Sequence, residues 1–149
     1  ELQELELAGL LHDIGMIGIP ENILNKEGEL TSDEYNIIKT HSPKGVKILE
    51  NIKQLESVVV MIKHHHERFD GKGYPDGLSG EEIPLGSRII CVADAYDGMV
   101  SDRAYRQGMN HDRAINIIKK DAGNHFDPIV VEAFIQTIYD LQTEEKIVA

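Results

Sequence analysis

The sequence contains no tryptophan, a single cysteine and no long run of apolar residues. One cysteine, Cys91, excludes an internal disulfide and fits a reducing compartment such as the cytoplasm. No stretch reaches the roughly 18 apolar residues that a membrane-spanning helix needs, so we expect no membrane segment within this chain. The chain opens on Glu1–Glu4, which is unlike the basic start of a secretory signal peptide. These absences predict a cytoplasmic protein.

Basic residues are also scarce. The chain has 15 Lys and Arg against 26 Asp and Glu, which gives a net charge of −11. Binding to duplex nucleic acid without sequence preference needs clustered Lys and Arg, so we exclude duplex nucleic acid as a partner. An anionic ligand can still bind where metal cations or local arginines reverse the field.

The 149 residues suit one domain, and apolar periodicity with capping residues predicts that it is helical. Thr31–Glu34 has the spacing of a capping box. The apolar run Val58–Ile62 is short enough for a strand, but no partner strand is visible, so we predict a helix there. The expected helices span about 2–15, 31–41, 42–49 (with Ser42 as N-cap), 55–66, 83–93, 112–120 and 129–141. We therefore predict an all-α fold with a single domain over residues 1–149.

Four short motifs contain the side chains with metal-binding chemistry: His12-Asp13, His41, His65-His66 and Asp94. Neighbouring side chains on a helix diverge by about 100°, so a tandem pair there cannot chelate one ion. It can instead serve two ions, or its carboxylate can bridge them. Two metals about 3.5–4 Å apart are the usual arrangement for hydrolysing phosphate esters.

The composition of this set restricts the metal. Imidazoles and carboxylates without a thiolate favour Fe or Mn, with Ni and Zn also compatible, over Mg or Ca. A single His-Asp pair would more often be a solvated pair than a ligand, and the prediction depends on the motifs occurring together. His64, His111 and His125 have no such context, and we expect ordinary roles for them.

Longer motifs around these residues resemble the HD-GYP domain family. HDIG at His12–Gly15 is similar to the opening signature of that family, and HHERFDGKGYPDG at His65–Gly77 is similar to its defining signature. The similarity continues through three further segments, Gly80–Pro84, Val92–Asp97 and Ser101–Arg106. The resemblance covers nearly the whole chain.

The resemblance implies a helical bundle of the HD superfamily that hydrolyses cyclic di-GMP to linear pGpG or to GMP in bacterial signalling. It implies two or more divalent metal ions, with Asp13 as the catalytic, bridging carboxylate. The implied metal ligands are His12, Asp13, His41, His65, His66 and Asp94.

The resemblance also implies residues that bind the substrate. Arg103 and Arg106 match positions expected to hold its phosphates, and Asp97 lies one turn from Asp94. The segment Gly73-Tyr74-Pro75 is expected beside the pocket, where it would also contact a GGDEF domain as in some relatives. An upstream receiver or sensor domain is expected as well.

Two departures from the family pattern leave alternatives open. The family usually has a lysine where this chain has Met16, and losing such a cation can cost on the order of 10²–10³ in rate. The helix that usually precedes the His-Asp motif is missing, so we expect the chain to be a fragment of a larger signalling protein. The alternatives are a catalytically weak module that binds metal and nucleotide or a GGDEF partner, and a phosphohydrolase of the HD superfamily that acts on another nucleotide.

Overall fold

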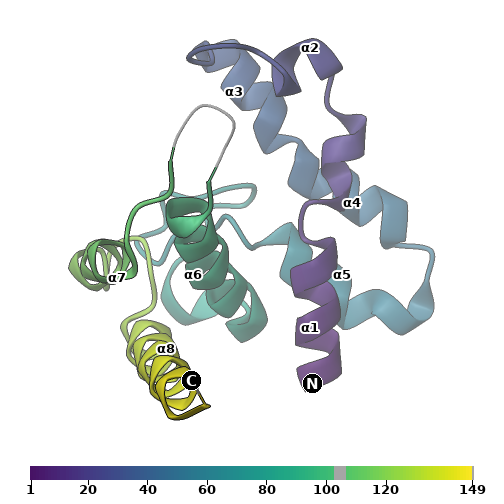
Figure 1. Cartoon of the computed structure of the whole chain (residues 1–149). Coiled ribbons are helices and arrows are strands. Elements are labelled where there is room, and N and C mark those ends of the chain that lie inside the picture. The colour runs from purple at the N-terminus through teal and green to yellow at the C-terminus, as the bar shows by residue number, and fades with distance from the viewer. Residues whose placement is uncertain (103–106, 149) are drawn as a thin grey trace.

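The computed structural model describes residues 1–102 and 107–148, with side-chain surroundings for 1–102 and 107–141 (Figure 1). Within these residues the regular structure is helical, and the β-type pairing is one isolated bridge between Ala122 and Phe126. The α-helices are α1 (Leu2–Leu11), α2 (Glu21–Leu24), α3 (Ser32–Lys39), α4 (His41–Leu49), α5 (Glu56–Lys63), α6 (Leu85–Val100), α7 (His111–Lys120) and α8 (Pro128–Val148). Short 3-10 helices occupy η1 (Ile14–Gly18), η2 (Lys53–Leu55) and η3 (Gly80–Glu82). The all-α prediction is confirmed.

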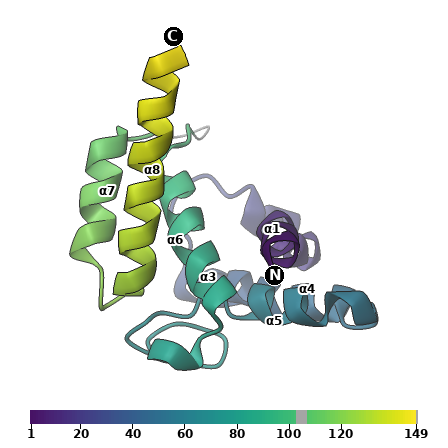
Figure 2. The ribbon, with the colours of Figure 1, turned by 90° about the horizontal axis from the view of Figure 1, so that it is seen from below.

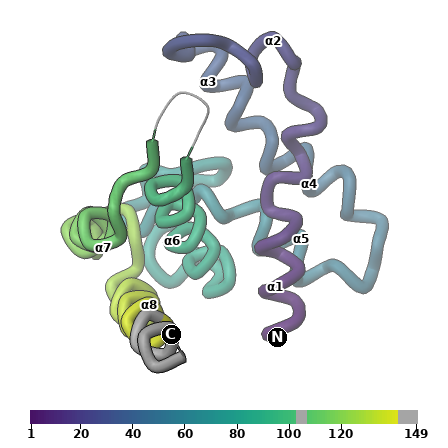
Figure 3. Tube along the Cα trace, in the orientation of Figure 1, coloured from purple at the N-terminus to yellow at the C-terminus, as the bar shows by residue number. Residues whose placement is uncertain are grey.

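Helix α6 lies between two groups of helices. Figure 2 shows α7 and α8 on one side of it and α1, α4 and α5 on the other. The core follows this division, because Ile90 packs with residues of α1, α4 and α5 while Cys91 and Val92 pack with α7 and α8. Cys91 is therefore a core residue, as predicted. Helices α2 and α3 lie at the end of the molecule opposite the start of α1 (Figure 3).

Local sequence signals account for several element boundaries. The capping box before α3 is present, since the Thr31 side chain accepts from the Glu34 amide and the Glu34 carboxylate accepts from the Thr31 amide. The run that could have been a strand is α5, with Val58 and Ile62 buried one turn apart. In the described part of the chain, no helix is long and apolar enough to cross a membrane.

Several boundaries differ from the prediction: α6 and α8 continue to Val100 and Val148, past the expected ends near 93 and 141, and α2 was not predicted. Three further differences lie near the site. Helix α1 ends at Leu11, so His12 and Asp13 leave the helix and lead into η1. Helix α5 ends at Lys63, before the tandem histidines. Helix α4 begins at His41, which places Ser42 inside the helix, buried, rather than at the N-cap.

Candidate metal centre

The predicted metal ligands come from four separate segments, and the structure brings them together. One ligand atom each from Asp13, His41, His65 and His66 lies within 4.8 Å of the other three. His41 and His65 are fully buried, whereas the Asp13 side chain is 49% exposed. The group therefore has a buried imidazole floor and one carboxylate on its open side.

His12 and Asp94 lie at the edge of this group. Nε2 of His12 is 3.4 Å from Oδ2 of Asp13 and 3.7 Å from Oδ1 of Asp94. Asp94 reaches the site from α6, the helix shared by both halves of the core. All six predicted ligands thus form one continuous cluster.

The tandem histidines behave differently from the sequence-based expectation. Their ring centroids are 3.9 Å apart, and both rings contribute to the group of four. The expected divergence of about 100° applies only to helical residues. Because α5 ends at Lys63, His65 and His66 lie in a turn where both side chains can point the same way.

A backbone contact fixes the spacing between the first two ligand segments. A Cβ added at Gly15 would overlap the carbonyl oxygen of His41 and the amide nitrogen of Gly45. Only glycine permits this approach of η1 to α4, and it sets Asp13 beside His41. Oδ1 of Asp13 is 3.4 Å from Nε2 of His41.

Backbone carbonyls select the tautomer of three histidines. In His12, His41 and His65 the Nδ1 atom lies 2.7, 2.8 and 2.7 Å from the carbonyl oxygen three residues earlier. A carbonyl only accepts, so Nδ1 donates and carries the proton in each ring. In the neutral form of each ring, Nε2 is then a lone-pair donor aimed into the cluster, which is how metal-bound histidines are usually oriented.

These residues fit a divalent metal. Nε2 of His41 and Nε2 of His65 face each other at 3.4 Å, with the proton of each ring already at Nδ1. Two facing lone pairs repel each other unless a cation lies between them. Asp13 adds an anionic oxygen beside them, and the donor set of imidazole and carboxylate is one that transition metals accept. The donor atoms and geometry of this cluster therefore fit a divalent metal ion.

Burial and neighbouring charges hold most of the cluster side chains in the protonation state that binds a metal. The hydrogen bonds that His12 donates to Asp13 and to Asp94 raise the pKa of His12 to about 10, and the His12 ring lowers the pKa of Asp13 to about 2. Burial lowers the pKa of His65 to about 4 and of His66 to about 3. At neutral pH three of these four groups already have the form that binds metal, and His12 alone must release a proton.

The segment after the tandem histidines folds back over them. Glu67 is 2% exposed, and its Oε1 accepts from the amides of Asp76 and Gly77 at 2.7 and 2.9 Å. This fold-back lays the Tyr74 ring on that of His66, with centroids 4.9 Å apart and planes at 29°. Glu67 was part of the quoted motif, but its role as the anchor of the loop was not predicted.

Glycines make this loop possible. Gly71 and Gly77 have φ of +76° and +72°, which agrees with the turn role predicted for them. A Cβ at Gly73 would overlap the backbone of His66 and Glu67, so the loop packs directly on the ligand segment.

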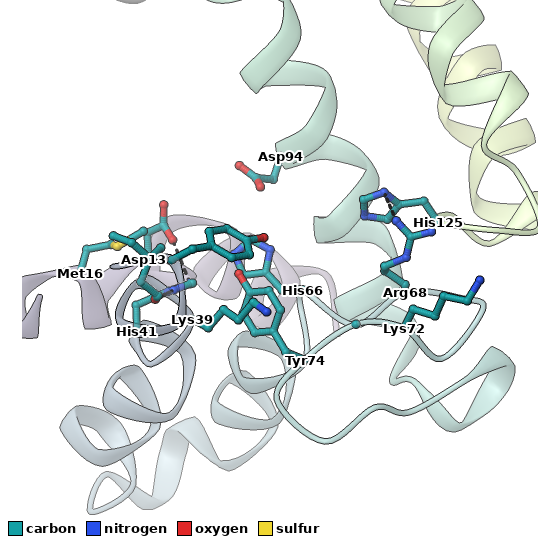
Figure 4. A pocket seen from close by; sticks show the side chains of 13 residues that line it. Asp13, Met16, Lys39, His41, His66, Arg68, Lys72, Tyr74, Asp94 and His125 are labelled. Atoms are coloured by element: carbon teal, nitrogen blue, oxygen red, sulfur yellow. Dashed lines mark hydrogen bonds and ion pairs between the residues drawn. The ribbon is translucent and has the colours of Figure 1, made fainter. Parts of the chain in front are cut away.

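A pocket of about 660 Å³ opens on the cluster (Figure 4). Asp13, His41, His66 and Asp94 form part of its wall. The rest of the wall is mostly basic or aromatic, together with Met16: Tyr35, Ile38, Lys39, Arg68, Lys72, Gly73, Tyr74 and His125. A pocket of this size is typical of small-molecule sites.

The other predicted substrate-binding residues have mixed placements. Gly73 and Tyr74 line the pocket, whereas Pro75 is exposed beyond it. Asp97 is exposed one turn after Asp94 and accepts from the Ser101 hydroxyl at 2.9 Å. Arg103 and Arg106 lie outside the described residues.

The histidines expected to be ordinary make hydrogen bonds outside the group of four. His64 contacts Asp76 at 3.0 Å, and His111 contacts the Tyr96 hydroxyl at 2.5 Å. His125 lines the pocket, which the sequence did not indicate.

Several known proteins resemble this chain. The HD domain family matches residues 1–130. A cyclic di-GMP phosphodiesterase of Pseudomonas aeruginosa is 44% identical over 92% of the chain, which spans 33% of that protein. A cyclic di-GMP phosphodiesterase of Thermotoga maritima is 43% identical over 96% of the chain, which spans 40% of that protein. The 3'3'-cGAMP-specific phosphodiesterase 1 of Vibrio cholerae is 37% identical over 98% of the chain and 35% of its own length.

A solved structure agrees on the fold. The crystal structure of a cyclic GMP-AMP-specific phosphodiesterase of Vibrio cholerae has a TM-score of 0.68 at 24% identity, over 93% of this chain and 38% of that one. The matched residues include every segment that contributes to the metal cluster. The chain belongs to the HD domain family, as its HD-GYP signature predicted.

Proposed function

We propose that this chain is a phosphodiesterase domain that hydrolyses cyclic di-GMP to linear pGpG or to GMP in bacterial second-messenger signalling. The observation that carries the proposal is the buried histidine–aspartate cluster that opens directly onto a basic, aromatic pocket. The relatives named for cyclic di-GMP are 41–44% identical, and those named for 3'3'-cGAMP are 33–38% identical. This difference favours cyclic di-GMP as the substrate.

The proposed cofactor is two or more divalent ions, Fe or Mn before Ni or Zn. The ligands would be His12, Asp13, His41, His65, His66 and Asp94. When bound in such a site, divalent ions activate water and offset the charge that develops on phosphorus. The buried imidazoles hold their Nε2 atoms toward the cluster, and Asp13 lies beside them in the pocket wall. Its place on the open side supports a bridging, catalytic role.

The pocket residues would orient the substrate. The Tyr74 ring, held on His66 by the folded loop, offers a flat surface on which a guanine can stack. Gly73 lines the pocket beside Tyr74. Contacts from Asp97, Pro75, Arg103 and Arg106 stay predictions, as do an upstream receiver or sensor domain and a cytoplasmic location. The exposure of Pro75 supports the predicted contact of the Gly-Tyr-Pro segment with a GGDEF domain.

A paired measurement of metal content and turnover tests the function. Protein loaded with Mn or Fe should convert cyclic di-GMP to pGpG or GMP, and His66→Ala should lose both metal and activity. His111→Ala is the matched control, because it removes a histidine that bonds to Tyr96 and belongs neither to the group of four nor to the pocket wall. Absence of any linear product from the fully loaded protein would refute the proposal.

Met16 supports one alternative, a module that binds metal and nucleotide but hydrolyses slowly. Its side chain lines the pocket where the family signature usually has a lysine, and a thioether brings no charge to the phosphate. Met16→Lys should raise kcat by at least tenfold if this alternative holds. An unchanged kcat would favour the efficient enzyme.

A further inference from the structure

Three cationic side chains line the pocket, and two of them share one carboxylate, Asp70. Arg68 forms two hydrogen bonds with the Asp70 carboxylate, at 3.0 and 2.8 Å. The Lys72 ammonium is 3.7 Å from the same carboxylate, and its side chain is 78% exposed. Lys39 is the third cation, and no carboxylate within the described residues forms an ion pair with it. Its charge is therefore available to a ligand.

Two aromatic rings hold the Lys39 ammonium in place. Its Nζ is 4.7 Å from the centroid of Tyr35 and 5.5 Å from that of Tyr74. Tyr35 is four residues earlier on α3, so it lies on the same helical face as Lys39. Aromatic faces attract an ammonium without cancelling its charge. The two tyrosines thus position a cation that keeps its full positive field.

This position is close to the metal cluster. The Tyr74 ring that faces Lys39 stacks on His66, so one aromatic ring separates the ammonium from the cluster. Figure 4 shows Lys39 on the same side of the pocket as Met16 and Asp13, with Lys72 on the opposite side. Asp13 and Asp94 repel an approaching phosphate, which makes a nearby free cation valuable to an anionic ligand.

We propose that Lys39 binds a phosphate of the substrate and supplies the positive charge that Met16 does not. The inference rests on the proposed function in that the substrate is taken to be a phosphodiester. Tyr35 and Tyr74 act as positioning residues for the ammonium. Lys39 contacts the phosphate itself, from the α3 wall of the pocket.

A structural role for Lys39 is the competing explanation. Lys39 is in the last turn of α3, where a cation interacts favourably with the helix dipole. Lys47 occupies the equivalent last turn of α4, is exposed, and does not line the pocket. Lys47→Met is therefore a matched control, because it removes the same charge from the same kind of helix position.

The experiment measures binding of inorganic phosphate to the Mn-loaded protein, and kcat and KM for cyclic di-GMP. Lys39→Met should weaken phosphate binding and lower kcat/KM by about tenfold to a hundredfold, with unchanged metal content. Lys47→Met should change either quantity less than about twofold. Adding Met16→Lys to Lys39→Met should restore at least half of the lost affinity on a logarithmic scale, since it returns a cation to the same side of the pocket. Should Lys39→Met fail to fold, Lys39→Gln and the charge-retaining Lys39→Arg are compared instead.

The measurement of phosphate binding distinguishes failure of the proposed function from failure of the proposal on Lys39. If the chain does not cleave cyclic di-GMP but loses phosphate affinity in Lys39→Met, the proposed function fails and the inference on Lys39 stands. If Lys39→Met binds phosphate and cyclic di-GMP as tightly as the wild type, the inference is overturned even though the enzyme is active. Absence of phosphate binding by the wild type would overturn it as well.

Discussion

Glu67 is the residue whose removal should most clearly expose how the loop is held. Its Oε1 accepts two amide hydrogen bonds, from Asp76 and Gly77, and hydrogen bonds to a charged group contribute about 1.5–3 kcal/mol each. Both amides belong to exposed residues that can turn to water, so the lower end of that range applies to each. Oε2 has no hydrogen-bond partner among the described residues, so its removal recovers some desolvation energy. We expect Glu67→Ala to lower the free energy of unfolding by about 2–3 kcal/mol.

The assay is urea unfolding of the chelated protein, with Glu67→Gln and Glu82→Ala measured alongside. Glutamine keeps one oxygen for the two amides without the charge, so it should cost only about 1 kcal/mol. Glu82 also accepts two hydrogen bonds in this region, both from Ser79, but it is exposed, and its loss should cost less than about 1 kcal/mol. The anchoring role is refuted if Glu67→Ala costs no more than Glu82→Ala. It also fails if Tyr74 fluorescence, read against a Tyr74→Phe reference, shows no change in the loop.

Three further predictions concern protons and backbone contact. Metal loading at pH 7 should release about one proton from His12, because its neighbouring carboxylates raise its pKa to about 10. Calorimetry in buffers of different ionisation enthalpy measures this release, and an equal release by His12→Asn would contradict the prediction. The metal-free, chelator-treated protein should lose stability as pH falls from 6.5 toward 4. Burial lowers the pKa of His65 to about 4 and of His66 to about 3, so the unfolded chain binds protons at a higher pH than the folded one. A urea midpoint that does not change over this pH range would contradict the prediction. Gly73→Ala should lower the free energy of unfolding by about 1–3 kcal/mol and reduce metal content. Gly9 lies in α1 with open space around it, so Gly9→Ala should leave the free energy of unfolding unchanged or raise it by up to about 1 kcal/mol. Equal effects of the two substitutions would exclude the backbone contact at Gly73.

Local signals predicted the helices well, because caps and periodicity act over a few residues. Thr31 caps α3 as expected, and α7 begins close to its expected start, with the Asn110 side chain accepting from the Arg113 amide. The exact ends were less predictable. The expected end of this helix at residue 66 and the observed end of α5 at Lys63 differ by only three residues, yet this decides whether the rings of His65 and His66 both reach one site.

The pocket could be predicted only in part. The metal-binding residue types stand out in the sequence, and their convergence was expected from the motifs. Lys39 and Tyr35 do not stand out, since a tyrosine and a lysine four apart are common on any exposed helix face. Their role depends on how α3 packs beside Tyr74, and no local pattern records that contact. Glu67 was hidden for the same reason, because its partners lie nine and ten residues later.

The close approach of Gly15 to His41 divides the site into a part that cannot be redesigned and a part that can. On the side of η1 and α4, backbone touches backbone with no side-chain layer between them, so no rotamer change can absorb an altered residue. On the opposite side the wall consists of a loop, two of whose amides donate to the Glu67 carboxylate, and of side chains of α3. A library intended to change the preference for one cyclic dinucleotide over another should therefore vary positions 35, 39 and 72 and leave positions 15 and 45 as glycine.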